Sequence, residues 1–303
     1  MTNAIEFTGV HRHFGEQAVL RGLELAVQPG EVYALLGRNG AGKTTAIQIL
    51  LGFLEPIAGS TRVLGLDSRT LQPADRERIG YVAEDHHVAD YRDVQTTLAY
   101  EAATRSRFDA AYASQMLARF ELPGATKVSK LSRGQRAQLA LALAIAGRPE
   151  VLVFDDPGLG LDAVARRDLL EAMIDLLVEA GTTVFFSSHA LADVERLADR
   201  VGILHDGALV ADVAVEDLRR RVESRRFLWT GAPPERFEAT GRPEVLACRR
   251  DSDGLDLLLV DFDPAAASWL PAGGRLTEPR PATLEDVFVG LTDHPTVNVE
   301  VSA

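Results

Sequence analysis

Residues 37–44 read GRNGAGKT, which fits the pattern G-x-x-x-x-G-K-[ST] at every position. The apolar residues 31–36 before it predict a short strand, and residues 45–54 after it predict a helix. Glycines let such a loop point its N–H groups at phosphate oxygens, and the N-terminus of the helix adds partial positive charge. The sequence therefore predicts a phosphate site, because a chance Gly-rich turn would not need this strand and helix around it.

The side chains of this loop predict how it holds a nucleotide. We expect Lys43 to reach the β and γ phosphates of a nucleotide, and the hydroxyl of Thr44 to ligate Mg²⁺. The residues assigned to the nucleotide here are Gly37, Arg38, Asn39, Gly40, Ala41, Gly42, Lys43, Thr44 and Thr45.

Two carboxylates follow a second apolar run, residues 151–154. Asp155 and Asp156 stand directly after this predicted strand. Alone, such a pair is more often a turn with exposed acids. In a chain that also has a phosphate loop, an Asp at this place holds Mg²⁺ through water, so we assign Asp155 to the metal.

The order of the predicted elements favours an α/β fold. Residues 5–27 alternate apolar and polar side chains, which predicts antiparallel strands with one solvated face. Residues 96–146 have a helical pattern, interrupted at Leu122-Pro123-Gly124, and we interpret residues 85–148 as an inserted helical subdomain. The runs 151–154 and 183–187 do not alternate, as in a parallel sheet covered on both faces.

Composition and charge exclude several classes of protein. The 303 residues are enough for one large and one small domain, and the net charge of −12 opposes attraction to nucleic acid or anionic lipid. No apolar run reaches the roughly 18 residues of a membrane-spanning helix, and the first residues lack the pattern of a secretory signal. The single cysteine, Cys248, suits a reducing compartment and is expected to pack in a strand. We therefore expect a cytoplasmic protein.

The character of the chain changes after about residue 220. Residues 219–226 read RRRVESRR, a charge run that is more simply a solvated helix face than a ligand site. Short strand-like pieces, such as residues 227–230 and 257–260, then alternate with Gly, Pro and Asp. We predict a domain over residues 1–220, a linker, and a small α+β domain over residues 221–303.

Residues 131–135 read LSRGQ, which resembles the LSGGQ signature of ABC ATPases with Arg133 in place of the first Gly. They stand before the apolar helix that leads to the Asp155 strand, as in that family. Other segments match in order: Phe14-Gly15 resembles the loop that stacks on adenine, residues 156–162 resemble the stretch from the catalytic carboxylate to the D-loop, and residues 187–189 resemble the switch-histidine loop. The chain is thus similar to ABC transporter ATP-binding subunits over about residues 5–218.

This resemblance implies a P-loop NTPase core with a mixed sheet, an antiparallel β subdomain and an inserted helical subdomain. It also implies that Ser132, Gly134 and Gln135, at a helix N-terminus, complete the ATP site of a second subunit in a head-to-tail dimer. Phe14 and Asp162 are assigned to the nucleotide on the same ground. Arg133 would add charge near that phosphate, or be a surface arginine without a role.

The catalytic assignments also follow from the resemblance. His189, preceded by two serines, would be the switch histidine that senses the γ phosphate, and Lys43 would act with it. The other histidines match no motif and are expected at the surface: His11, His13, His86, His87, His205 and His294.

Two positions depart from the family pattern. Asp156 stands where the family has a Glu as general base. Its side chain is shorter than that of Glu by about one C–C bond, ~1.5 Å, which withdraws the carboxylate by that distance. A displacement of this order can lower the rate on the order of a hundredfold, so we expect a slow ATPase. Glu84 stands where the family has the Q-loop glutamine; it can approach Mg²⁺, or be an exposed loop acid.

The resemblance also suggests partners. Residues 85–100, with Asp90, Tyr91 and Asp93, stand where ABC ATPases receive the coupling helix of an integral membrane permease. Residues 282–292 resemble the C-terminal helix of bacterial ABC-2 type ATP-binding subunits, and they also suit a helix that packs on its own domain. We expect a homodimer on the inner face of the cell membrane. A low-activity regulatory subunit of a heterodimer and a non-transport ABC ATPase are the alternatives.

Overall fold

A six-stranded mixed sheet forms the centre of the computed structural model, with the strand order β10-β9-β3-β8-β7-β6. β3 pairs parallel with β8 and β9, β7 pairs parallel with β8 and β6, and β10 pairs antiparallel with β9. The strands are β3 (Val32–Gly37), β6 (Ile79–Val82), β7 (Val151–Asp155), β8 (Thr183–Ser188), β9 (Arg200–His205) and β10 (Ala208–Ala214). The predicted α/β class is confirmed.

The structure describes residues 2–89, 92–162, 164–167, 169–171, 173, 181–230, 242, 244–264, 269–270 and 274–293. Asp90, Tyr91 and His294 lie outside these residues. None of the helices in the described part has the length and apolar character that crossing a bilayer requires.

The strand β3 divides its side chains between two hydrophobic cores. Tyr33 and Leu35 pack with the helix α1 (Lys43–Leu50) and an antiparallel sheet in one core. Val32, Ala34 and Leu36 pack in the other, which also contains residues of the helices α5 (Arg133–Ala146) and α7 (Leu191–Leu197). Because both faces of the strand are buried, it needs apolar side chains at every position, and this explains the runs without alternation.

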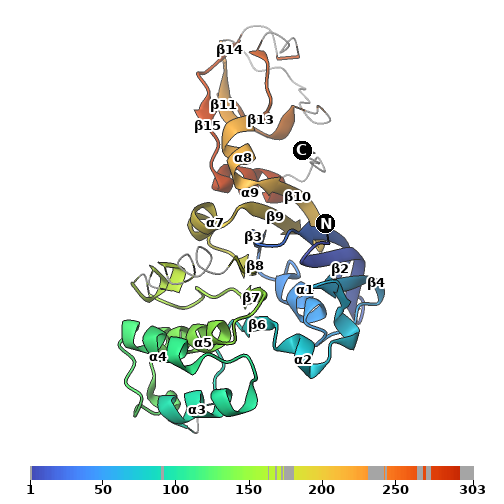
Figure 1. Cartoon of the computed structure of the whole chain (residues 1–303). Helices are drawn as coiled ribbons and strands as arrows, with labels where there is room; N and C mark the ends of the chain where they lie inside the picture. Colours follow the sequence, from blue (N-terminus) through green and yellow to red (C-terminus); the bar gives the residue numbers. More distant parts are fainter. Residues whose placement is uncertain are drawn as a thin grey trace.

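The antiparallel sheet has the order β2-β1-β4-β5 and lies beside the central sheet, with α1 between them (Figure 1). β1 (Ile5–Phe14) and β2 (Gln17–Val27) form the predicted hairpin, and their inward side chains are buried. The remaining elements here are β4 (Ala58–Val63), β5 (Leu66–Asp67), α1 (Lys43–Leu50), η1 (Ser68–Thr70) and α2 (Pro73–Arg76).

Three helices stand between β6 and β7 along the chain: α3 (Val94–Thr104), α4 (Ala110–Arg119) and α5 (Arg133–Ala146). A short turn, η2 (Val128–Lys130), precedes α5. Each helix begins at a capping side chain, because Asp93, Asp109 and Ser132 each accept a hydrogen bond from a backbone N–H in the first turn. α5 packs on the central sheet, while α3 and α4 extend away from it (Figure 1).

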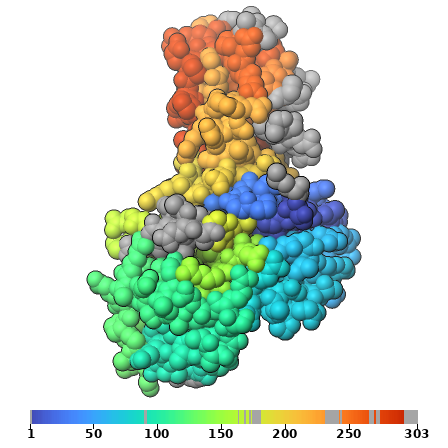
Figure 2. All heavy atoms as spheres, in the orientation of Figure 1, coloured from blue at the N-terminus to red at the C-terminus, as the bar shows by residue number. Residues whose placement is uncertain are grey.

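The C-terminal residues form a second antiparallel sheet, β12-β13-β11-β14, with β15 beside β11. They rise as a column on the rest of the molecule (Figure 2). The elements are α8 (Val215–Arg221), β11 (Val222–Trp229), β12 (Val245–Arg250), β13 (Gly254–Val260), β14 (Gly274–Leu276), β15 (Arg280–Pro281) and α9 (Leu284–Asp293).

The predicted linker at residues 219–226 is wrong. α8 ends at Arg221 and β11 begins at the next residue, so the charge run is regular structure. Its arginines are paired: Arg221 with Asp261, and Arg226 with Asp251 and Asp256. The hydrophobic core also continues from Leu218 through Val222 to Leu284. The division into domains at residue 220 stays a prediction.

Candidate nucleotide site

The phosphate loop has the backbone that its glycines allow. α1 begins at Lys43 and is preceded by Gly42, whose φ is 110°, while Gly40 has a φ of 83°. A Cβ at Gly42 would lie 2.8 Å from both the carbonyl oxygen of Val19 and Cδ2 of Leu20. Only glycine fits here, and the loop therefore presents backbone rather than side chains to the space in front of α1.

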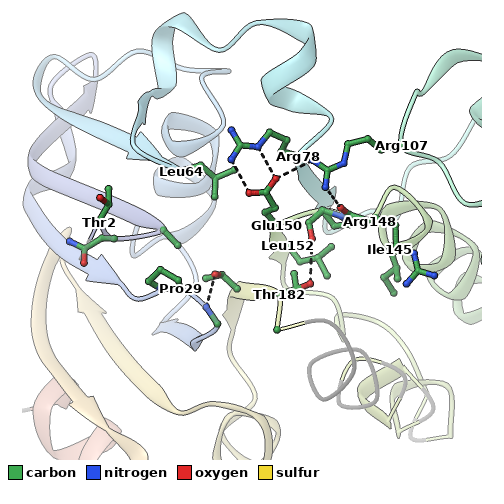
Figure 3. A pocket seen from close by; sticks show the side chains of 16 residues that line it. Thr2, Pro29, Leu64, Arg78, Arg107, Ile145, Arg148, Glu150, Leu152 and Thr182 are labelled. Carbon is green, nitrogen blue, oxygen red and sulfur yellow. Dashed lines mark hydrogen bonds and ion pairs between the residues drawn. The ribbon is translucent and has the colours of Figure 1, made fainter.

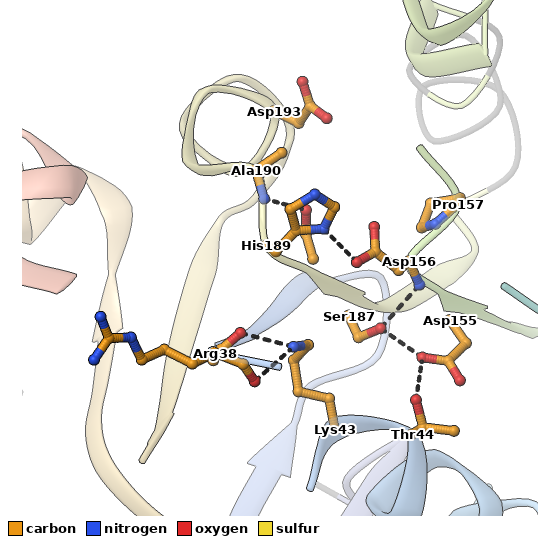
Figure 4. Close-up of polar contacts among 12 residues, drawn as sticks. Arg38, Lys43, Thr44, Asp155, Asp156, Pro157, Ser187, His189, Ala190 and Asp193 are labelled. Carbon is orange, nitrogen blue, oxygen red and sulfur yellow. Dashed lines mark hydrogen bonds and ion pairs between the residues drawn. The ribbon is translucent and has the colours of Figure 1, made fainter. Parts of the chain in front are cut away.

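Lys43 lies across the inside of this loop (Figure 4). Its Nζ donates to the carbonyl oxygens of Gly37 at 2.7 Å and Arg38 at 3.3 Å. Burial lowers the pKa of Lys43, and the nearby carboxylates, Asp156 first, oppose that shift. An ammonium held on two carbonyls is poised to exchange them for phosphate oxygens, which are stronger partners.

Asp155 joins three elements at the carboxyl ends of the central strands. Its Oδ1 accepts from Thr44 Oγ1 at 3.1 Å and from Ser187 Oγ at 2.8 Å. The carboxyl is buried, and this burial raises its pKa, while the two hydroxyl hydrogen bonds lower it. The sequence matched residues 187–189 as a unit but did not show that Ser187 would bridge the two carboxylate residues.

The residues at this point fit a magnesium ion. The hydroxyl of Thr44 and the carboxylate of Asp155 are oxygen donors of the kind that Mg²⁺ prefers, and they already converge. Within the described residues, no group of three or more His, Cys, Asp and Glu side chains gathers as a metal site. A magnesium ion here would therefore keep several waters and share phosphate oxygens, as is usual for it.

Asp156 is held from both of its ends (Figure 4). Its backbone N–H donates to Ser187 Oγ at 2.9 Å, and its Oδ2 lies 2.5 Å from Nδ1 of His189. Its φ of 44° is in the left-handed region, which is uncommon for a residue other than glycine. The surrounding contacts compensate for this strain, and strain of this kind is often found at functional sites.

These residues surround one cavity of about 450 Å³. Glu84 is exposed and also lines this cavity. The three residues predicted to hold the metal ion, Thr44, Glu84 and Asp155, therefore line the same cavity. Three lining residues were not predicted: Gln17 and Val19 of β2, and Leu159. The full lining is Gln17, Val19, Asn39, Gly40, Gly42, Lys43, Thr44, Thr45, Glu84, Asp155, Asp156, Leu159 and His189.

The other predicted nucleotide residues are not among those that line this cavity. Ser132 caps α5: its Oγ accepts from Gln135 N at 3.2 Å, and Gln135 Oε1 accepts from Ser132 N at 3.0 Å. Asp162 caps the next helical segment through hydrogen bonds from Val164 N and Ala165 N. Phe14, at the end of β1, is 49% exposed, and the guanidinium of Arg12 lies 4.8 Å from its ring centre.

The surface position predicted for His86 is wrong. His11, His13 and His87 are exposed and His205 is half-buried, but His86 has no exposed surface. Its Nε2 lies 2.9 Å from the carbonyl oxygen of Pro157. Burial lowers the pKa of His86. A single histidine in a loop gives no periodic signal, so the sequence could not indicate its burial.

A second cavity of about 600 Å³ lies at the amino ends of the central strands, opposite the nucleotide site (Figure 3). Its polar wall is one ion-pair network: Glu150 accepts from Arg78 at 2.8 Å and from Arg107 at 3.0 Å. Arg78 precedes β6 and Arg107 precedes α4. The network therefore ties the inserted helices to the central sheet.

The mixed sheet, the glycine loop and the buried aspartate define a P-loop nucleotide-binding protein. The sequence profile of the ABC transporter family matches residues 20–158. The Nod factor export ATP-binding protein I of Burkholderia lata is 33% identical over 297 residues, which cover 95% of this chain and 96% of that protein. The ABC transporter ATP-binding protein YtrB of Bacillus subtilis is 31% identical over 71% of this chain and 73% of its own length. The chain belongs to the ATP-binding subunits of ABC transporters.

Solved structures agree with this assignment. An ATP-binding subunit of an ABC transporter matches with a TM-score of 0.65 and 27% identity, over 72% of this chain and 92% of that one. A dimeric ATP-binding cassette bound to ADP and Pi matches with a TM-score of 0.61 over 70% and 98%, and at 21% identity it shows the fold alone. The resemblance inferred from the sequence is confirmed. ABC ATP-binding domains bind ATP or ADP, and members of the family are ATPases.

Proposed function

We propose that this chain binds Mg²⁺ and ATP, hydrolyses ATP slowly, and drives a separate membrane permease as a homodimer. One observation carries the proposal. The five side chains of Lys43, Thr44, Asp155, Asp156 and His189 line a single cavity at the carboxyl ends of the central strands.

Each of these side chains has a place in the reaction. The phosphate loop and Lys43 bind and orient the β and γ phosphates, while Thr44 and Asp155 would hold the magnesium ion. That ion, when bound, supplies positive charge to the phosphate oxygens. Asp156 accepts a proton from the attacking water, and His189, held by Asp156, orients toward the γ phosphate. The roles of Glu84 as a metal neighbour and Phe14 as an adenine platform are part of the same proposal.

The geometry of Asp156 supports a low rate. The side chain of Asp156 is shorter than that of the usual Glu by ~1.5 Å. Its carboxylate already forms a hydrogen bond with His189. A carboxylate that is held back from the water loses much of its advantage as a base. The active form is therefore expected to turn over slowly and to keep its nucleotide for a long time.

The position of the signature supports a dimer. Ser132 and the N-terminus of α5 form an anion-binding end that does not line the cavity of its own chain. A second copy, arranged head to tail, would bring its Ser132, Gly134 and Gln135 to this cavity. The nucleotide would then lie between two subunits.

A groove between α3, α5 and residues 81–89 supports a permease as partner. The groove has a volume of about 240 Å³, and Tyr81, Val88, Tyr100 and Arg105 are among the residues that line it. Tyr100 is 49% exposed, and the guanidinium of Arg92 lies 4.1 Å from its ring centre. Such an amphipathic groove suits a short helix of a membrane protein. The chain would then sit on the inner face of the cell membrane through that permease.

The direction of transport is proposed from the relatives. Several of them carry names that include Nod factor export, and they match nearly the whole chain, the C-terminal part included. This supports an exporter of the ABC-2 type. α9, on which the ABC-2 resemblance rests, packs on its own chain through Leu284, Val287 and Leu291. A helix that packs on its own domain is compatible with the ABC-2 resemblance.

A second candidate is a low-activity regulatory subunit within a heterodimer, which the paired departures at Asp156 and Glu84 favour. A non-transport ABC ATPase has less support, because the net charge of −12 opposes binding to nucleic acid.

ATP hydrolysis by the purified full-length chain tests the proposal. We expect measurable phosphate release that requires Mg²⁺, and a loss of release with Lys43→Ala. Hydrolysis that appears only after a second, different cassette is added would support the heterodimer instead. No hydrolysis under either condition would refute an ATPase.

A further inference from the structure

His86 connects two loops that are distant in the sequence. It follows Glu84 by two residues, and its backbone N–H donates to the carbonyl oxygen of Ala83 at 2.9 Å in a tight turn. Its φ is 52°, so the turn directs this side chain inward with a strained backbone. The imidazole is fully buried, and Nε2 meets the carbonyl oxygen of Pro157 at 2.9 Å.

The chemistry of the contact between His86 and Pro157 shows which atom donates the hydrogen bond. A carbonyl oxygen only accepts hydrogen bonds, so Nε2 must carry the proton and donate it. Nδ1 is buried and has no hydrogen-bond partner within the described residues. Within the described residues, the contact to Pro157 is thus the one hydrogen bond of this imidazole.

Pro157 is the residue directly after Asp156, and it is buried as well (Figure 4). Ser187 fixes the N–H of Asp156, His189 fixes its carboxylate, and His86 fixes the carbonyl beyond it. A movement of that carbonyl changes the backbone angles of the two residues before it. Since Asp156 already has an unfavourable φ of 44°, release of Pro157 would let it relax and turn its carboxylate.

The signature region lies close to the same point. A Cβ at Gly160 would collide with the guanidinium of Arg133. Arg133 also contributes to the electrostatic surroundings of His86. The guanidinium of Arg133 therefore lies against Gly160 of its own chain, three residues after Pro157.

We propose that His86 is a positioning residue: through its hydrogen bond to Pro157 it holds the carboxylate of Asp156 in place for hydrolysis. This proposal rests on the proposed function, because it assumes that Asp156 acts on water. It assigns a role to a residue that matches no motif. It also links the loop of Glu84 directly to the loop of Asp156.

The test compares four variants of the full-length chain. His86→Leu removes the donor, and His87→Leu is the matched control on the exposed neighbour. His86→Gln places an amide N–H near the position of Nε2, whereas His86→Asn places it near Nδ1. Both amides are polar and buried, so they differ mainly in which donor position they keep.

We expect the turnover number to fall on the order of tenfold in His86→Leu and His86→Asn, with KM for ATP and the affinity for a non-hydrolysable ATP analogue unchanged. His86→Gln and His87→Leu should stay within about twofold of the wild type. Equal turnover in the Gln and Asn variants would overturn the proposal. So would a loss of nucleotide affinity that parallels the loss of turnover, since that indicates general damage to the site.

The Gln and Asn pair decides the question even where His86→Leu does not fold. Wild-type hydrolysis and its loss in Lys43→Ala test the proposed function separately. A wild type that hydrolyses ATP, with all His86 variants alike, would refute only the role of His86.

Discussion

Oδ2 of Asp156 and Nδ1 of His189 lie 2.5 Å apart, so the two proposed catalytic side chains hold each other within one chain. This contact fixes the orientation of the imidazole. It also occupies one carboxylate oxygen and leaves the other for water.

Asp156→Glu should raise turnover. The added methylene moves the carboxylate forward by ~1.5 Å, toward the place where the family's glutamate acts. We expect an increase on the order of tenfold or more in steady-state phosphate release, and a near-complete loss in Asp156→Asn. An unchanged rate with Glu would show that the site is already built around the shorter side chain.

His189→Ala should lower turnover while nucleotide binding persists. The phosphate loop and Lys43 hold ATP without His189, so KM should change little while the turnover number falls about a hundredfold. His11→Ala, on the exposed face of β1, is the control and should resemble the wild type. The prediction fails if both variants lose activity equally, or if His189→Ala no longer binds ATP.

Tyr33→Phe should destabilise the central sheet slightly. The hydroxyl of Tyr33 donates to Oδ1 of Asp212 at 3.2 Å, and Arg200 donates to the same oxygen at 2.6 Å. The Phe variant keeps the ring stacked on Phe185 and leaves Asp212 paired. We expect the free energy of unfolding in urea to fall by about 1 kcal/mol. A loss above roughly 3 kcal/mol would mean that Arg200 does not compensate.

Glu150 should contribute stability that acid removes. Its hydrogen bonds to Arg78, and then those to Arg107, hold the pKa of its carboxyl at about 2, below the ordinary 4.5. A carboxyl with a lowered pKa in the folded state stabilises the fold above pH 4.5 and loses this effect as the pH falls toward 2.

Urea unfolding of the wild type and of Glu150→Gln, at several pH values, measures this effect. The difference in unfolding free energy should be present at pH 6 and shrink below pH 4.5. A difference that does not depend on pH would assign the effect to packing. Because Glu150 is 43% exposed, we expect a small difference that salt reduces.

Cys248 should react slowly with iodoacetamide in the folded protein. Burial in β12 raises the pKa of its thiol to about 11. Only the thiolate reacts, so the thiolate fraction at pH 8 is about a hundredfold below that of a free thiol with the ordinary pKa of 9.0. We expect fast alkylation once the protein is unfolded in urea. Equally fast alkylation in the folded state would contradict the packed strand.

Much of the fold could be predicted because its signals are local. The glycine pattern of residues 37–44 requires a strand before it and a helix after it, and both are present as β3 and α1. The buried strands β7 and β8 were visible as apolar runs without alternation. Asp155 followed from its place at the end of such a strand.

The rest depends on contacts between distant residues. That Ser187 would bridge Asp155 and Asp156, or that His86 would reach Pro157, follows from the pairing of strands and from one tight turn. The charge run 219–226 is regular structure rather than the predicted linker, and its arginines pair with residues far along the chain, such as Asp261 and Asp256. Charge patterns indicate exposure, and they do not show which side chains will pair.

The last helix, α9, completes the core that begins in the strands of the central sheet. The N–H of Leu284 donates to the carboxylate of Glu195 in α7 at 2.7 Å, across 89 positions of the chain. Synthesis proceeds at roughly 5–20 residues per second. The apolar residues that α9 covers are therefore synthesised several seconds before α9 itself. A nascent chain released at residue 220 would expose these apolar residues to chaperones and proteases.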